Sequence, residues 1–146
     1  MKIRIKDTQK KITINKKLIR HLAGQILTIK GEGNSELSIF FVGASRIRAL
    51  NEEFRKTDRP TDCLAFSMRE GKKGGNPALL GDVVICPEMA RQAAGIYKTT
   101  IEQEIYLYLI HGILHLLGYD DVNTKSRAIM EKEQARILTS LTSLRP

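Results

Sequence analysis

Two histidines and a nearby aspartate are the residues of this chain best placed to do chemistry together. His111 and His115 are four positions apart in an apolar run that is predicted to be helical, so both imidazoles lie on one face, about 6 Å apart along the axis. Gly118 is typical of the position just past a helix C-terminus, where the chain turns back. Asp121 then follows at a distance that suits a third ligand. The spacing therefore predicts one divalent metal site formed by His111, His115 and Asp121.

A ligand set of two histidines and one carboxylate leaves a coordination position free, which is typical of catalytic zinc. Burying two imidazoles without partners would cost on the order of 2 to 7 kcal/mol each, and a shared cation removes that cost. A cation of this kind lowers the pKa of water from 15.7 towards roughly 7, so hydrolysis is the expected reaction class.

The residue after the first histidine argues against a peptidase. Zinc peptidases with a similar helix carry a glutamate there as general base, and this chain has Gly112. Glycine in a helix interior costs about 1 kcal/mol relative to alanine. Gly112 therefore predicts that a neighbouring group approaches the helix backbone closely.

Length and composition limit which class of protein this chain belongs to. The chain has 146 residues and 42% hydrophobic content, which predicts one globular domain over residues 1–146. Its formal charge of +8 suits a polyanionic partner, nucleic acid first and an anionic membrane surface second. No apolar run approaches the roughly 20 residues that span a bilayer, and no secretory signal is visible, so we expect a cytoplasmic protein. Cys63 and Cys86 are then expected to be reduced, buried thiols.

Hydrophobic periodicity predicts a small sheet covered by helices. Strands are expected at residues 3–6, 36–42, 63–67 and 82–86. Helices are expected at residues 16–29, 45–55, 87–97, from Thr100 through the two histidines, and from Asn123 to about Leu141. The order of these elements indicates an α+β or α/β fold in which helices cover the sheet, and the fold we predict is α+β with a small mixed sheet and a buried central helix that carries His111 and His115.

Side-chain patterns also predict details of these helices. Asn15, Ser45 and Asn123 are candidate N-caps, and Thr100 with Gln103 forms a capping-box pattern. In the second helix Ile47, Leu50 and Phe54 are expected to face inward, and in the last helix Ile129 is one of the residues expected to pack on the core. Residues 69–77, rich in Lys and Gly, are expected to form a mobile surface loop.

Basic residues are densest in the middle of the chain. They are Arg46, Arg48, Arg55, Lys56, Arg59, Arg69, Lys72 and Lys73. Contacts of such side chains with phosphates would supply most of the affinity for a nucleic acid and would weaken steeply with salt. With four Tyr, four Phe and no Trp, strong sequence readout by base stacking is not expected, so substrate choice would rest on backbone shape, accessible single strand or a partner.

The stretch 111–121, which reads HGILHLLGYDD, resembles the H-G-x-L-H-L-x-G-Y-D-H signature of the YbeY family of bacterial endoribonucleases and rRNA maturation factors. Residues 50–66 and 80–83 resemble two further motifs of that family. The three motifs follow in order over about the last two-thirds of the chain. The resemblance implies a single α+β domain, a zinc ion held by His111, His115 and residue 121, and a functional Arg55. It also implies action on ribosomal RNA of the small ribosomal subunit, and we expect no membrane or DNA partner.

Two departures from the family pattern affect these expectations. The third ligand of the family is a histidine, whereas this chain has Asp121, which lowers the net charge of the site by one and lets Mn²⁺ compete better with Zn²⁺. Cys63 and Ala65 stand where the family usually has valine and serine, which removes a hydroxyl near the expected substrate groove.

The leading hypothesis is a metal-dependent endoribonuclease that acts on single-stranded RNA in ribosome maturation and quality control. In this hypothesis Arg55 stabilises the transition state through its planar guanidinium. The alternative is a non-catalytic rRNA-binding factor whose metal site is structural or degenerate. Asp121 is the residue that keeps the alternative open.

Overall fold

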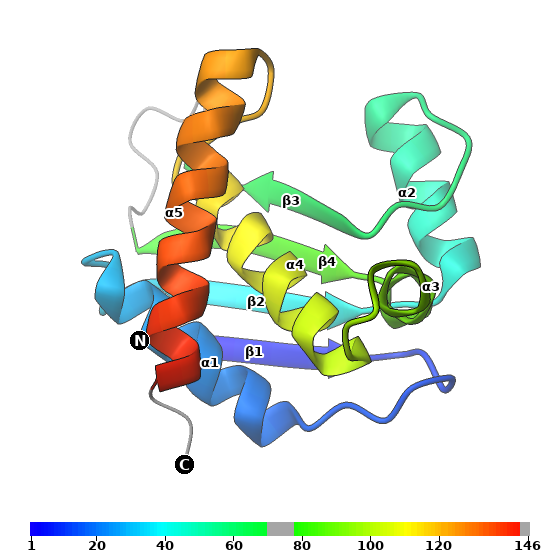
Figure 1. Cartoon of the computed structure of the whole chain (residues 1–146), viewed down its shortest axis with the longest axis horizontal. Helices are drawn as coiled ribbons and strands as arrows, with labels where there is room; N and C mark the ends of the chain where they lie inside the picture. The colour runs from blue at the N-terminus through cyan, green and yellow to red at the C-terminus, as the bar shows by residue number, and fades with distance from the viewer. Residues whose placement is uncertain (70–77, 144–146) are drawn as a thin grey trace.

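The computed structural model describes residues 1–69 and 78–143. In this part of the chain four strands form one sheet in the order β1-β2-β4-β3 (Figure 1). The strands are β1 (Lys2–Asp7), β2 (Glu36–Phe41), β3 (Cys63–Ser67) and β4 (Leu79–Ile85). The pairs β1–β2 and β2–β4 are parallel, whereas β3 runs antiparallel to β4 at the end of this order. The predicted mixed sheet of an α+β fold is confirmed.

Five helices surround this sheet in the described residues, and their positions agree closely with the prediction. They are α1 (Lys16–Ile29), α2 (Ala44–Arg55), α3 (Pro87–Tyr97), α4 (Ile101–Leu116) and α5 (Thr124–Ser143). In that part of the chain no helix is long and apolar enough to cross a membrane.

Three of the four predicted helix caps are confirmed. The side-chain oxygens of Asn15 and Asn123 accept hydrogen bonds from the backbone N–H groups three residues later, and Thr100 forms the complete capping box with Gln103. The prediction for Ser45 was wrong, because α2 begins one residue earlier, after Gly43, with no side-chain cap.

The helices lie on both faces of the sheet, with α1, α4 and α5 on one face (Figure 1). Successive side chains of the central strand β4 point to opposite faces of the sheet. Val83 and Ile85 belong to the core under α4, whereas Val84 packs with Ile47 of α2. The predicted buried central helix is α4. Its fully buried residues are Leu109, Ile110, Ile113 and Leu114.

Two residues predicted to face the core are exposed. The side chain of Phe54 is 57% exposed and that of Ile129 is 53% exposed. Phe54 lies in the last turn of α2, where its ring packs edge-on against Phe66 at a centroid distance of 5.0 Å instead of lying beneath the helix. The predicted loop at residues 69–77 lies outside the described residues except for Arg69, which forms an ion pair with Glu32.

Both cysteines are free and buried, as predicted. Cys63 belongs to the core under α4, whereas Cys86 belongs to the cluster around α2 on the other face of the sheet. Burial is the largest effect on both thiols and raises their pKa values. The two cysteines are therefore inert packing residues.

The backbone of α4 comes unusually close to the sheet at Gly112. A Cβ atom at this position would lie 2.6 Å from Cγ1 of Val83 and 3.0 Å from Sγ of Cys63, which is far inside van der Waals contact. The close approach predicted from this glycine is confirmed. It seats the helix that carries the histidines directly on β3 and β4.

Replacing Gly112 with alanine tests this contact. Alanine favours a helix, yet here its methyl group must displace Val83 or the helix, so we expect the free energy of unfolding to fall by about 1 to 3 kcal/mol. Gly95→Ala in α3 is the matched control, because open space surrounds that position, and it is expected to stabilise the protein by up to about 1 kcal/mol. Urea denaturation of the two variants measures the difference, and equal midpoints would contradict the packing argument.

Candidate metal centre and its cleft

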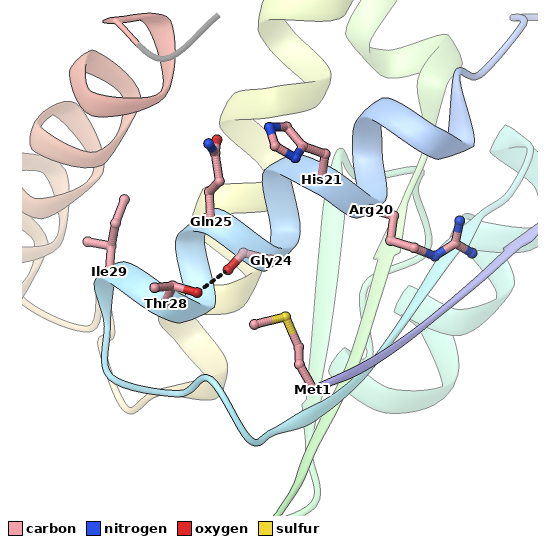
Figure 2. A pocket seen from close by; sticks show the side chains of 7 residues that line it. All are labelled: Met1, Arg20, His21, Gly24, Gln25, Thr28 and Ile29. Carbon is pink, nitrogen blue, oxygen red and sulfur yellow. Dashed lines mark hydrogen bonds between the residues drawn. The ribbon is translucent and has the colours of Figure 1, made fainter.

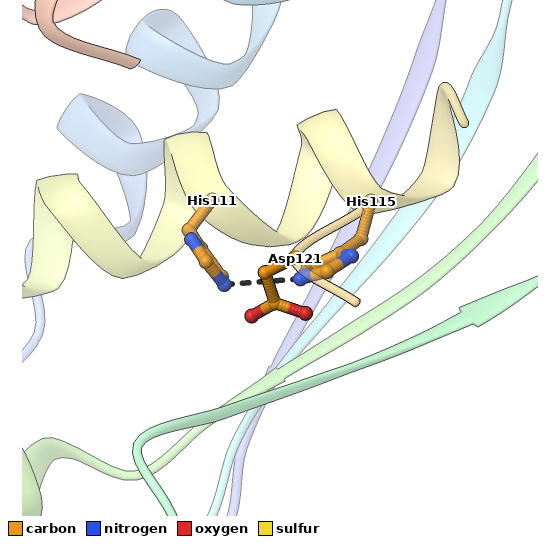
Figure 3. A group of neighbouring side chains, drawn as sticks. All are labelled: His111, His115 and Asp121. Atoms are coloured by element: carbon orange, nitrogen blue, oxygen red, sulfur yellow. Dashed lines mark hydrogen bonds between the residues drawn. The ribbon is translucent and has the colours of Figure 1, made fainter. Parts of the chain in front are cut away.

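The chain reverses direction directly after α4. The Gly118 N–H donates to the His115 carbonyl at 3.1 Å, and the Tyr119 N–H donates to the Leu114 carbonyl at 3.0 Å. These two bonds form a Schellman motif, which needs a left-handed residue at its turn. Gly118 supplies it with φ of +99°, a conformation that residues with a Cβ rarely adopt. The turn returns the chain along α4 and brings Asp121 beneath the two histidines (Figure 3).

His111, His115 and Asp121 converge on one small volume. Each offers one ligand atom, and these atoms all lie within 4.8 Å of one another. Figure 3 shows the two imidazoles and the carboxylate pointing into the same space, with His111 Nε2 and His115 Nε2 3.0 Å apart. Tetrahedral zinc with bonds of 2.0 to 2.1 Å holds two nitrogens roughly 3.3 Å apart. The donor set and its spacing therefore fit a divalent cation, and the role of the three residues as ligands stays a prediction.

A residue that the sequence analysis missed orients the first histidine. Gln134 of α5 presents its Oε1 to Nδ1 of His111 at 2.9 Å. Because a carbonyl oxygen only accepts, Nδ1 carries the proton and Nε2 keeps its lone pair for a cation. A signal for Gln134 existed in the sequence, since it is a polar residue between Met130 and Ile137 on the apolar stripe of the predicted last helix.

Burial of His115 favours the neutral form of its imidazole. Burial lowers the pKa of His115, and the neighbouring His111 and the more distant Arg55 act in the same direction, whereas Asp121 opposes them. Only a neutral imidazole has a lone pair for a metal, so a lowered pKa extends the pH range over which His115 is able to ligate.

The turn that carries Asp121 is anchored by Lys30, which directly follows α1. Lys30 Nζ donates to the Tyr119 hydroxyl at 2.8 Å and forms an ion pair with Glu133 of α5 at 3.7 Å. The Lys30 and Glu133 side chains are both only 18% exposed, so this pair is screened less than a surface pair. The contacts connect the ends of α1 and α4 with the middle of α5, and they hold the turn in place beside the ligand set.

The ligand set opens onto a cleft of about 730 Å³ that follows strand β3 to the end of α2. Arg55, in the last turn of α2, lines this cleft together with His111, His115 and Asp121. Its positive charge reaches far enough to act on the pKa values of His115 and Cys63. The structure thus brings all four predicted site residues to one cleft, and the role of Arg55 in catalysis stays a prediction.

The other basic residues that the structure describes lie outside the lining of this cleft. Arg48 forms an exposed ion pair with Asp58 at 2.8 Å. Arg69 forms a partly buried ion pair with Glu32 at 2.8 Å, in a neighbouring hollow that shares His115 with the cleft. Lys72 and Lys73 lie outside the described residues. Among the described residues, Arg55 is the one lysine or arginine that lines the cleft.

A separate hollow of about 440 Å³ lies beside α1 (Figure 2). The sulfur of Met1 lies close to Gly24, where an added Cβ would be 3.3 Å from it. The remaining lining side chains are those of Arg20, His21, Gln25, Thr28 and Ile29. The Thr28 hydroxyl is occupied by a hydrogen bond to the Gly24 carbonyl at 2.9 Å. Among the described residues of this lining His21 is the one histidine, and no Cys, Asp or Glu accompanies it as a second metal ligand. We therefore assign this hollow no role in metal binding or catalysis.

Comparison with known proteins agrees with this geometry. The family model described as Endoribonuclease YbeY matches residues 4–142. The chain belongs to the YbeY family of endoribonucleases. Its predicted membership and its predicted class, an enzyme that hydrolyses nucleic acid, are both confirmed.

Individual relatives cover nearly the whole chain. It is 34% identical to an Endoribonuclease YbeY of Pelotomaculum thermopropionicum, over 99% of this chain and 100% of the relative. It is 39% identical to an Endoribonuclease YbeY of Geobacter metallireducens, over 82% and 81%. The solution structure of a Thermotoga maritima protein superposes with a TM-score of 0.63 at 32% identity, over 93% of this chain and 86% of the other.

Removing the acceptor behind His111 tests whether Gln134 belongs to the metal site. Gln134→Leu leaves Nδ1 without a partner and frees the imidazole to rotate, so we expect affinity for Zn²⁺ to fall by about 10- to 100-fold. Gln134→Glu is the matched control, because it keeps an acceptor oxygen and is expected to bind at least as tightly as the unmodified chain. Competition with a chromophoric chelator measures both affinities. Unchanged affinity in Gln134→Leu would show that α5 has no part in the site.

Proposed function

We propose that this protein is a metal-dependent endoribonuclease that cleaves single-stranded RNA in the maturation and quality control of small-subunit ribosomal RNA. The observation that carries the proposal is the convergence of His111, His115, Asp121 and Arg55 on one open cleft beside strand β3. The names of the relatives support an RNA substrate. The formal charge of +8 supports binding to a polyanion.

The residues of the cleft divide the chemistry between two sides. On one side His111, His115 and Asp121 hold the cation, which when bound supplies Lewis-acid chemistry that acidifies water and polarises a phosphoryl oxygen. On the other side Arg55 presents five N–H donors in a planar fork, which match the oxygens of a phosphodiester. A phosphate between the two sides is held by Arg55 while negative charge develops on its oxygens.

Zinc is the cation we propose, with Mn²⁺ as its competitor. Two imidazole nitrogens favour zinc, while the carboxylate oxygen of Asp121 adds a harder ligand and lowers the charge of the site. Metal analysis of protein purified without chelators identifies the ion and its stoichiometry.

A cytoplasmic location fits the same proposal. Cys63 and Cys86 lie on opposite faces of the sheet, so they are not placed to form a disulfide, and reduced buried thiols are usual in a reducing compartment.

Substitution of the metal ligands tests the proposed reaction. His115→Ala removes one imidazole and is expected to abolish cleavage of a single-stranded RNA oligonucleotide, measured by gel electrophoresis with Zn²⁺ or Mn²⁺ added. Asp121→His is the companion variant, and we expect it to bind Zn²⁺ and to cleave at least as fast as the unmodified chain. If cleavage occurs only in Asp121→His, the native site is degenerate and the rRNA-binding alternative holds.

Substitution of Arg55 tests the other side of the cleft. Arg55→Ala is expected to lower kcat by about 10²- to 10³-fold, the usual effect of losing one transition-state donor, and Arg55→Lys is expected to recover only part of it, because an ammonium cannot bond two oxygens in a plane. Arg48→Gln is the matched control on the same helix, since Arg48 is paired with Asp58 outside the cleft. Single-turnover kinetics on one RNA substrate measures the cleavage rates of all three variants. An equal loss of rate in Arg48→Gln would show that Arg55 acts only as a non-specific positive charge.

A further inference from the structure

A second hollow adjoins the cleft on the other face of the sheet. It has a volume of about 420 Å³, lies between α2 and the sheet, and shares Phe54 and Phe66 with the cleft. Its other lining residues are Phe40, Val42, Arg46, Leu50, Asp82 and Val84. A strand of RNA in the cleft would therefore pass the mouth of an aromatic-lined hollow large enough for one nucleobase.

Phe54 forms the partition between the cleft and this hollow. Its side chain is 57% exposed, and its ring is supported by Phe66 in an edge-to-face contact of 5.0 Å and 65°. It directly precedes Arg55, the residue proposed to hold the phosphate. An exposed aromatic face next to a phosphate-binding arginine is the arrangement that single-stranded nucleic acids use for base stacking.

Asp82 places a carboxylate in the same hollow. Its side chain is partly buried, and within the described residues it takes part in no hydrogen bond or ion pair. Burial raises the pKa of this carboxyl. A carboxylate oxygen pair accepts from two adjacent N–H donors. Guanine presents such a pair on its Watson–Crick edge, N1–H and the 2-amino group, whereas adenine, cytosine and uracil each present one donor group there.

We propose that this hollow is a nucleobase subsite that selects guanine, stacked on Phe54 and hydrogen-bonded through N1–H and the 2-amino group to Asp82. The inference rests on the proposed function, because the base belongs to the RNA strand whose phosphate lies beside Arg55. Phe54 and Asp82 are specificity residues in this arrangement, and the metal ligands have no part in base selection. Arg46 of α2 also lines the hollow. In this arrangement its positive charge attracts the phosphate of the selected nucleotide and so adds to the affinity for RNA.

The test compares two short uridine strands that contain one central guanosine or one central inosine, which lacks only the 2-amino group. Binding is measured by fluorescence anisotropy in the His115→Ala background, so that the strand stays intact. We expect the guanosine strand to bind roughly tenfold more tightly than the inosine strand. In Asp82→Asn, which keeps size and shape, the ratio is expected to fall to near one, because the amide offers one acceptor oxygen in place of two.

Two aromatic variants complete the test. Phe54→Ala is expected to weaken binding of both strands by at least fivefold with the guanosine preference retained, since stacking does not depend on the 2-amino group. Tyr97→Ala is the matched control, because Tyr97 is 70% exposed at the end of α3 and lies outside the lining of the cleft and the hollow. Its binding is expected to equal that of the parent protein.

A guanosine preference that is equal in the parent and in Asp82→Asn overturns the proposal, as does the absence of any preference in the parent. The proposal is also overturned if the affinities for both strands are unchanged in Asp82→Asn and in Phe54→Ala. In that case the hollow would be a site for a protein partner. Cleavage is measured separately with the unmodified chain. Selective binding without cleavage would refute the proposed nuclease reaction and keep the subsite, whereas cleavage without selectivity would refute the subsite alone.

Discussion

The contact between α4 and the sheet at Gly112 is the constraint on which the site depends. With no side chain at that position, the helix backbone lies against Val83 and Cys63, and the adjacent His111 and the following turn of the helix with His115 are held beside strand β3. A side chain at Gly112 would lift the helix, and the histidines with it, away from the cleft. Close packing therefore determines where the two histidines lie, since dense interiors transmit small displacements.

Polar contacts then orient what the packing has positioned. Gln134 fixes the tautomer of His111, the Schellman turn at Gly118 returns Asp121 to the histidines, and Lys30 holds Tyr119 within that turn. The three contacts come from α5 and from the ends of α4 and α1, so the ligand set depends on helices that meet only in the folded chain. A site that is supported in this way loses little freedom when a cation binds, which favours affinity.

The edge of the sheet gives the site its access. Strand β3 ends the strand order in the described part of the chain, so its outer side is free to line a cleft, and α2 ends beside it with Phe54 and Arg55. The metal ligands approach from one face of the sheet and α2 from the other. An RNA strand at this edge would reach both Arg55 in the cleft and the hollow with Asp82, which connects the proposed cleavage with the proposed choice of base.

Local signals in the sequence determined the helices, the strands, three of the four predicted caps and the candidate ligands, because periodicity, capping patterns and glycine conformations act over a few neighbouring residues. Gly112 even predicted a close contact, though not its partners. Only the tertiary structure decided that Phe54 lies exposed beside Arg55, that Gln134 stands behind His111, and that Arg48 and Arg69 pair elsewhere. These outcomes depend on contacts between residues that lie 10 to 37 positions apart, which the packing of the helices and strands brings together and which no local pattern encodes.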